Sequence, residues 1–339
     1  MKLLPVCAES LELAAKILRS GGLVAFPTET VYGLGADAFN PQALAKVFQA
    51  KGRPHFDPLI IHIAALQSLE DAADLSLLSE GALKKLFLLA EEFWPGPLSI
   101  ILPKNEKIPG IATAGLPTAA IRFPAHEAAQ KLISLSGGAV AAPSANPFGA
   151  LSPTRAEHVR DALGEKVELI LDGGPARIGL ESTVLDITGE SIKILRPGGT
   201  PKEAIEDLIG PVHEAYSAEK NGLCPHSPGQ LKSHYAPKTP LSVFTKEDIV
   251  SLPYEENCAF LFFDGASKDE WLHAQKQKPP DSPLIKVLSE SGSPLEAASV
   301  LFETLHEMDK RKVSKIFAQS APGEGLGEAI NDRLRRGCA

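Results

Sequence analysis

The chain has 339 residues, of which 44% are apolar and 22% charged, and its formal net charge is -8 at neutral pH. This length predicts about two domains with substantial cores. The negative charge argues against a protein that coats nucleic acid nonspecifically, so any RNA contact should be confined to a local basic groove. The four cysteines are far apart and form no CxxC pair. They indicate neither a disulfide framework nor a cysteine zinc site.

Targeting signals are not evident in the sequence. The apolar run in MKLLPVCAES is too short for the core of a secretory signal, and Glu9 follows it at once. No apolar stretch reaches the roughly 18 residues of a membrane span. We therefore expect a soluble cytoplasmic protein without membrane contact.

The first elements lead to a cluster of polar residues. Residues 10–19 carry apolar side chains on one face and are predicted to form an amphipathic helix. Residues 23–26 form a short apolar run between two glycines and Pro27, which predicts a buried strand. Thr28, Glu29 and Thr30 follow this strand. Because ligands in open α/β sheets lie beyond the carboxyl ends of strands, these residues are candidates for a site.

Two cations flank the end of the next predicted helix. Asn40 and Pro41 are favourable residues at its start, and Gly52 is a typical stop. Lys51 and Arg53 lie on either side of that glycine. Arg can hold a phosphate as a planar fork and Lys as a point charge. Both would also complement the negative end of the helix dipole, so the local pattern leaves two interpretations open.

Arg122 interrupts an apolar strand in the sequence AAIRFPAH. An unpaired buried charge is costly, so this side chain should either reach solvent or meet an anion. A ligand carboxylate would satisfy it with bidentate geometry. A structural carboxylate such as Glu29 would serve equally well. Earlier in the chain, Trp94 precedes the predicted buried strand at residues 98–102 and is interpreted as a core anchor.

Further polar residues stand at predicted strand ends. The small-residue strand at 138–142 ends in Ser144 and Asn146, which suit contacts to phosphate or ribose but also fit a simple turn. Ser182 starts a strand, and Arg196 follows another in the sequence LRPGG. The short connection between residues 184–188 and 192–195 predicts a hairpin. Alternating strands and helices across residues 1–210 therefore predict a twisted, mixed α/β sheet.

The remainder of the chain divides into a linker and a smaller domain. Residues 211–240 are rich in Pro, Ser, Gly and His and are predicted to be a linker. The motif SPGQLKSHYAP within it is more varied than a spacer requires, which favours a lid over the site. His226 and His234 lack the spacing of a metal site. Residues 241–339 return to alternation and predict a second α/β domain, in which the glycines at 323–327 form no recognised nucleotide loop.

Taken together, these motifs resemble one family. The sequence is similar to the threonylcarbamoyl-AMP synthases of the YrdC-like superfamily, in the long form with a linker and a C-terminal domain. The resemblance is dense across the first domain and the linker, and looser in the second domain through GLGEAINDRL. The motifs that carry it are PTETVYGLG, KGRP, PLIIHIA, WPGPLSIIL, AAIRFPAH, APSAN, SPT, ESTV, LRPGG and SPGQLKSHYAP.

The resemblance implies a fold, an activity and a set of site residues. It implies a YrdC-like mixed-sheet catalytic domain at 1–210, a linker or lid at 211–240 and a Rossmann-like α/β domain at 241–339. The implied enzyme is a nucleotidyltransferase that joins L-threonine, bicarbonate or CO2 and ATP into threonylcarbamoyl-AMP, with release of pyrophosphate. Matching motifs place Thr28, His62, Thr118, Arg122 and Ser182 around threonine, and Lys51, Arg53, Ser144, Asn146, Ser152, Arg196 and Tyr235 around ATP, with Lys51 and Arg53 catalytic.

Partners and cofactors follow from the same resemblance. A partner tRNA threonylcarbamoyl transferase complex would move the product to adenosine next to the anticodon, and direct tRNA contact by this chain stays open. Mg2+ is expected to accompany ATP, with no metal site on the protein, since no carboxylate cluster is evident. Asp57 stands where many relatives have Asn or His, which leaves a nucleotide contact there open. The alternatives are a non-catalytic factor binding structured RNA through Lys51, Arg53 and Arg196, and carbamoyl transfer in metallocentre maturation, whose acylphosphatase and zinc-finger segments this chain lacks.

Overall fold

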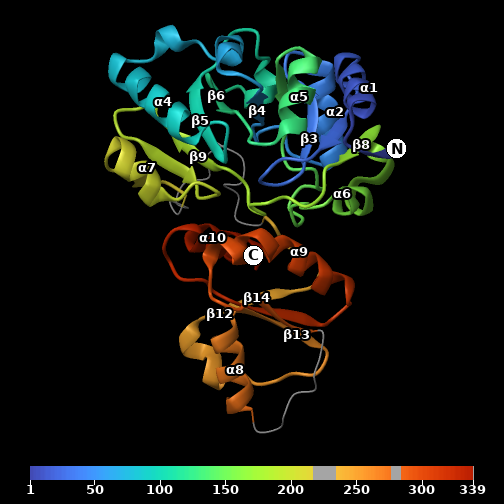
Figure 1. Cartoon of the computed structure of the whole chain (residues 1–339), viewed down its shortest axis with the longest axis vertical. Coiled ribbons are helices and arrows are strands. Elements are labelled where there is room, and N and C mark those ends of the chain that lie inside the picture. The colour runs from blue at the N-terminus through green and yellow to red at the C-terminus, as the bar shows by residue number, and fades with distance from the viewer. Residues whose placement is uncertain (217–233, 276–283, 339) are drawn as a thin grey trace. The chain divides into compact units, whose positions relative to one another are not determined.

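The computed structural model describes residues 1–216, 234–275 and 284–338. These residues group into two compact units (Figure 1). The first unit contains most of the chain up to the linker. The second contains the C-terminal part together with the short segments 149–151 and 178–180. Each unit is described separately below. In the part of the chain that the structure describes, no helix is long and apolar enough to cross a membrane.

The first unit is built on one large mixed sheet. Among the described residues its strand order is β1-β8-β2-β3-β7-β4-β6-β5-β9-β10-β11, with parallel and antiparallel neighbours. The predicted hairpin is confirmed, because β9 and β10 pair antiparallel. The elements are β1 (Lys2–Pro5), α1 (Ala8–Arg19), β2 (Val24–Phe26), β3 (Gly33–Asp37), α2 (Pro41–Lys51), β4 (Ile60–Ile63), α3 (Leu69–Ala72), α4 (Glu80–Phe93), β5 (Leu98–Pro103), β6 (Thr118–Arg122), α5 (Glu127–Ser136), β7 (Ala139–Ala141), α6 (Ala156–Leu163), β8 (Leu169–Asp172), β9 (Thr183–Asp186), β10 (Lys193–Arg196), α7 (Lys202–Ile209) and β11 (His213–Glu214).

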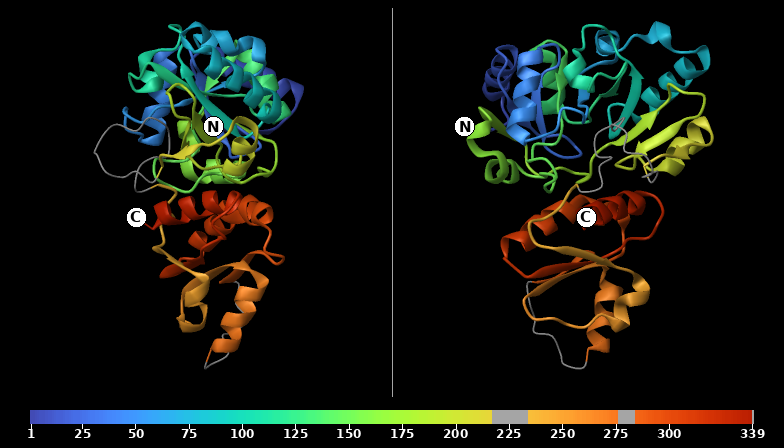
Figure 2. Two further views of the ribbon diagram at one scale, coloured as in Figure 1. Left: turned by 90° about the vertical axis from the view of Figure 1, so that its left-hand side faces the viewer. Right: turned by 180° about the vertical axis from the view of Figure 1, so that it is seen from behind.

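The two faces of this sheet are covered differently. Successive strand residues point to opposite faces. One face carries Ile61, Ile121 and Ile100 and packs into the main core, which also contains residues of α2, α4, α6 and α7. On the opposite face α1 and α5 pack side by side over residues of β2, β7 and β8 (Figure 2). Further along that face lies a small apolar cluster that consists of strand residues, with Ala215 packed against it: Ile60, Ile101, Ala120, Val184 and Leu195.

The sheet extends beyond the predicted boundary at residue 210. Strand β11 pairs in parallel with β10, and Val212 is buried in the main core. Tyr216 packs against the same core. The predicted linker at 211–240 therefore begins with residues that belong to the first unit. Most of the remaining linker, including His226 and the motif residues up to 233, lies outside the described residues.

The second unit is a smaller three-layer α/β structure. Its sheet has the order β12-β15-β13-β14, and all three of its pairings are parallel, as the Rossmann-like prediction requires. Helices α9 and α10 lie on one face of the sheet and α8 on the other (Figures 1 and 2). Trp271 packs with Phe260 and Phe262 in the core on the α8 side. The elements are β12 (Leu241–Phe244), β13 (Cys258–Asp264), α8 (Gly265–Ala274), β14 (Ile285–Ser289), α9 (Pro294–Lys310), β15 (Lys315–Gln319) and α10 (Leu326–Gly337).

Candidate active site

A row of polar side chains crosses adjacent strands of the large sheet. His62 on β4 pairs with Arg122 on β6, and Arg122 pairs with Ser99 on β5. Paired residues point to the same face, and neighbouring strands are about 4.8 Å apart. The three side chains therefore stand next to one another on the face opposite the main core. All three are buried.

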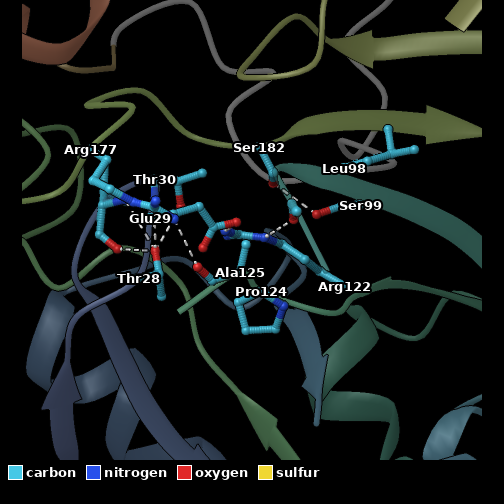
Figure 3. Close-up of polar contacts among 12 residues, drawn as sticks. Thr28, Glu29, Thr30, Leu98, Ser99, Arg122, Pro124, Ala125, Arg177 and Ser182 are labelled. Carbon is cyan, nitrogen blue, oxygen red and sulfur yellow. Dashed lines mark hydrogen bonds and ion pairs between the residues drawn. The ribbon is translucent and has the colours of Figure 1, made fainter. Parts of the chain in front are cut away.

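Arg122 is held by two contacts at the end of β6. Its Nε donates to the carbonyl of Gly96 at 3.1 Å. Its Nη2 donates to Oε1 of Glu29 at 2.6 Å (Figure 3). The Glu29 pair is buried on both sides. Of the two partners that the sequence left open for Arg122, the structural carboxylate is present. Nη1 has no partner among the described residues, so one edge of the guanidinium is available for an anion.

His62 is neutral in this environment. It is 3% exposed, and its Nδ1 lies 3.3 Å from the carbonyl oxygen of Ile60. Burial lowers the pKa of His62 to about 3, and the positive charge of Arg122 acts in the same direction. The ring of Phe26 contacts it edge-on at a centroid distance of 6.5 Å. His62 therefore offers hydrogen-bonding groups to a ligand without bringing a charge.

Thr28 and Ser182 complete the polar set near Arg122. Thr28 Oγ1 donates to the carbonyl of Val31 at 2.6 Å and accepts from the backbone N–H groups of Thr30 and Val31, which fixes the turn after β2. Ser182 Oγ lies 2.8 Å from Ser99 Oγ (Figure 3). The sequence analysis did not select Ser99. A serine inside the apolar run LSIIL was the signal that would have identified it.

Thr118 is the member of the predicted threonine set that lies apart. It begins β6, four residues before Arg122, which corresponds to about 13 Å along the strand. Because β4 and β6 are parallel, Thr118 lies at the edge where β4 begins and where the turn after α2 enters that strand. It faces the same side of the sheet as Arg122, at the other end of the strand. The structure therefore does not bring Thr118 together with His62, Arg122 and Ser182.

The turn after α2 places Lys51 and Arg53 as the sequence predicts. Asn40 caps the start of α2 by accepting from the backbone N–H groups of Gln42 and Ala43, and Gly52 ends it with φ of 63°. Lys51 Nζ donates to the carbonyl oxygens of Ser144 and Asn146, both at 2.5 Å. Lys51 therefore ties the loop after β7 to the turn.

Arg53 forms a buried pair with Asp57. Its Nε and Nη2 donate to the carbonyls of Asp57 and Pro58. Nη2 lies 2.9 Å from Asp57 Oδ2, which is an ion-pair contact. Neither carboxylate oxygen of Asp57 has a hydrogen-bond partner among the described residues. Burial raises the pKa of Asp57, while the charges of Arg53, Lys51 and Arg196 oppose that rise.

Lys51 shares this cationic surrounding. Burial lowers the pKa of Lys51 well below its usual range, and repulsion from Arg53 adds to the effect. Lys51, Arg53 and Arg196 therefore concentrate positive charge around one carboxylate. An anion with several negative charges would relieve the repulsion between them.

Arg196 joins the cationic region to the row on the strands. Arg196 is the last residue of β10 and lies opposite Val184 of β9. Its Nη2 donates to the carbonyl of Ser182 at 2.8 Å and to Ser182 Oγ at 3.1 Å. Nearby, Ser152 Oγ donates to Oε1 of Glu181, a second buried residue that the sequence analysis did not select.

Tyr235 belongs to the second unit. Its backbone has φ of 63°, and its ring contacts His234, Phe302 and the guanidinium of Arg333, which lies 4.8 Å from the ring centroid. These contacts hold the ring in a defined place within that unit. Its predicted closure over ATP stays a prediction.

Family comparisons agree with this architecture. Residues 16–198 match the Sua5/YciO/YrdC family model, described as telomere recombination, and residues 200–339 match the model described as threonylcarbamoyl-AMP synthase, C-terminal domain. The threonylcarbamoyl-AMP synthase of Pyrococcus abyssi is 42% identical, over 96% of this chain and 93% of its own length. That of Bacillus subtilis is also 42% identical, over 95% and 91%.

A solved structure is similar along nearly the whole chain. The crystal structure of Pyrococcus abyssi Sua5 complexed with L-threonine aligns with a TM-score of 0.86 and 39% identity, covering 99% of this chain and 97% of that one. Both domain models and the full-length relatives identify the same two-domain arrangement. This chain belongs to the threonylcarbamoyl-AMP synthase family, with a Sua5/YciO/YrdC domain followed by the C-terminal domain of that family.

Proposed function

We propose that this chain is an L-threonylcarbamoyladenylate synthase, a nucleotidyltransferase that uses L-threonine, bicarbonate or CO2, and ATP. The observation that carries the proposal is the juxtaposition of two sets of side chains. The first set, His62, Arg122 and Ser182, offers hydrogen-bonding groups and one cation. It adjoins a region where Lys51, Arg53 and Arg196 concentrate positive charge. Such a pair suits a reaction that joins an amino acid derivative to a nucleotide.

In this proposal the row on the strands binds threonine. Arg122 takes the carboxylate through its Nη1 edge, and Thr28, His62 and Ser182 provide hydrogen-bonding groups for the amine and hydroxyl. His62 suits a neutral role because burial lowers its pKa to about 3. Thr118 is assigned to the ATP side of the site, given its place at the other end of β6.

The cationic region binds the ATP phosphates. The phosphate charges are neutralised by Lys51, Arg53 and Arg196. The loop residues beside the phosphates are Ser144, Asn146 and Ser152. The threonine amine adds to bicarbonate or CO2, and an oxygen of the resulting carbamate attacks the α-phosphorus while pyrophosphate leaves. This step needs positioning and stabilisation of charge, and no protein nucleophile. Closure of Tyr235 over the nucleotide would exclude water from the labile adenylate.

Mg2+ would enter this site with ATP. Among the described residues, no group of three or more His, Cys, Asp or Glu could hold a metal ion. Mg2+ commonly binds through substrate phosphates and retained waters, with one or two carboxylates from the protein. When bound, it would supply further charge neutralisation to the phosphates.

The product would then pass to a tRNA threonylcarbamoyl transferase complex in the cytoplasm. That complex would place the threonylcarbamoyl group on adenosine beside the anticodon. We assign this chain to synthesis of the adenylate, and direct contact with tRNA is not required for that step.

Pyrophosphate release tests the proposal. The purified chain is assayed with ATP, Mg2+ and bicarbonate, with and without L-threonine, and the quenched product is analysed by mass spectrometry. Threonine-dependent release with the mass of threonylcarbamoyl-adenylate is the expected result. A folded protein that releases no pyrophosphate and binds structured RNA with steep salt dependence would favour the RNA-binding alternative instead.

A further inference from the structure

Glu29 carries a buried oxygen that the protein does not satisfy. The side chain follows β2 and is 1% exposed. Its Oε1 accepts from Arg122 Nη2 at 2.6 Å. Its Oε2 is buried and has no hydrogen-bond partner among the described residues. Leaving a charged acceptor buried and unsatisfied is costly, so this oxygen needs an explanation.

The neighbouring side chains do not supply the missing donor. The Thr28 hydroxyl is committed to the carbonyl of Val31, and the Thr30 hydroxyl lies 2.8 Å from Thr28 Oγ1 (Figure 3). His62 is neutral, and burial also lowers the pKa of His126, on which Glu29 acts electrostatically. Arg177 donates to the carbonyl of Ala125.

Arg122 presents the complementary feature. It uses Nε on Gly96 and Nη2 on Glu29, and Nη1 has no partner among the described residues. The buried Glu29–Arg122 ion pair therefore presents an unsatisfied acceptor on Glu29 and an available donor edge on Arg122. A zwitterionic α-amino acid carries the matching groups, an ammonium and a carboxylate separated by one carbon.

We infer that Oε2 of Glu29 binds the α-ammonium group of the amino acid substrate while Nη1 of Arg122 binds its carboxylate. This inference rests on the proposed function and adds the group that recognises the amine. Glu29 is then a substrate-binding residue. Because it contacts the ammonium group, the site should bind amino acids more tightly than acids that lack the amine. Glu29 also positions Arg122, so a test has to separate the two roles.

A ligand without the amine separates them. (R)-3-Hydroxybutanoate matches L-threonine except that hydrogen replaces the ammonium group. Titration calorimetry measures binding of both ligands to the full chain and to Glu29→Gln. We expect the wild-type chain to prefer threonine at least about tenfold, and Glu29→Gln to lose at least about tenfold in threonine affinity. Its affinity for hydroxybutanoate should stay within about twofold, because the lost contact is to the amine.

Matched variants keep the test sharp. Glu29→Asp retains the charge and should retain preference for threonine, which gives a second measurement if Glu29→Gln folds poorly. Glu168→Gln removes a carboxylate that accepts from the Leu23 backbone N–H, at the opposite end of β2, and should change neither affinity. ATP binding by each variant reports that the fold is intact.

The outcomes distinguish this inference from the function on which it rests. Equal losses for both ligands in Glu29→Gln would show that Glu29 acts only through Arg122, and unchanged affinities would show that it does not act on the ligand. Either result would overturn the inference and leave the proposed function standing. A wild-type chain that binds ATP but no threonine would overturn the proposed function, and this inference with it.

Discussion

The charge of Lys51 depends strongly on its surroundings. It is buried, lies beside Arg53 and donates to two backbone carbonyls. Burial lowers its pKa well below the usual range, so its charged form is costly until phosphates are present. The residue is therefore suited to respond to ATP binding by taking up or retaining a proton.

This linkage predicts a pH dependence of ATP affinity. ATP favours the ammonium form, so its affinity should fall as pH rises through the lowered pKa of Lys51, by up to about tenfold per pH unit. Lys51→Arg stays charged and should show a flatter profile. Calorimetric Kd values across pH check this, and identical profiles would contradict it.

Lys51→Ala should lose adenylate synthesis while the fold survives.

His62 predicts a loss of stability in acid. Its folded pKa of about 3 lies below the ordinary value of about 6.5. Between these values the unfolded chain binds a proton that the folded chain does not, so the free energy of unfolding falls as pH is lowered. The slope from this group reaches about 1.4 kcal/mol per pH unit.

Urea denaturation at several pH values between 7 and 4 measures this slope. His62→Gln has no imidazole to protonate, so its unfolding free energy should fall less steeply than that of the wild-type chain. Parallel curves for the two proteins would show that the imidazole is not the group responsible.

At the scale of elements, the β9–β10 hairpin sets the distance between Ser182 and Arg196. Gly198 follows the hairpin, and a Cβ at this position would lie 2.4 Å from backbone atoms of Glu181, Ser182 and Thr183. Backbone cannot yield as a flexible side chain does. The two segments can approach this closely only because residue 198 is glycine.

Gly198→Ala should therefore damage both stability and synthesis. The segment before β9 has to move, at a cost of about 1–3 kcal/mol, and displacement of Ser182 by about 1 Å should reduce turnover by roughly a hundredfold. Thermal unfolding and threonine-dependent pyrophosphate release measure the two effects. Gly189→Ala, in the loop of the same hairpin, meets only an atom 3.7 Å away and should leave both nearly unchanged. Similar losses in the two variants would refute the argument from close approach.

Elements with a strong local pattern were predicted, and elements defined by distant partners were not. The helix ending at Gly52, the strand after Trp94 and the hairpin are all confirmed. Strand β1 was missed because its partner β8 lies far away in the sequence. Strand β3 was not predicted either. In the fold, Gly35 fits closely against the ring of Phe26, which no local pattern reveals.

The same reasoning explains the candidate site. The sequence singled out Lys51 and Arg53 at the end of a helix, and Arg122 and Arg196 at strands. Buried cations of this kind are rare enough to need a reason. Which of these residues lie close together depends on the order of the strands in the sheet, and local sequence patterns do not predict that order. Ser99 stands next to Arg122 because β5 pairs with β6, and Thr118 lies at the opposite end of β6 from Arg122.

At the scale of the whole molecule, the second unit holds pieces of the catalytic part of the sequence. Segments 149–151 and 178–180 group with it. Gly149 accepts from the backbone N–H of Ala236, and Gly179 lies against the backbone of Ala298 and Ser299. These segments directly precede Ser152 and Glu181. The second unit therefore includes residues from the first part of the sequence and is not made of the C-terminal part alone.

A chain that ends after Tyr216 tests this role. It keeps β11 and all strands of the large sheet but loses Tyr235 and the partners of both short segments. We expect synthesis to fall at least about tenfold, because the loops bearing Ser152 and Glu181 lose contacts that position them. The pyrophosphate assay and thermal unfolding of the shortened chain check this. Full activity would show that the linker only tethers the second unit.

The pairing of β1 with β8 also bears on how the chain is made. Lys2 lies opposite Leu169 in the sheet. During synthesis at about 5–20 residues per second, β1 therefore waits roughly 10–30 s before its partner leaves the ribosome. Throughout that interval its backbone is an open edge that a neighbouring nascent chain could join. Pairing of β1 within its own chain therefore competes, during synthesis on polysomes, with pairing between neighbouring nascent chains.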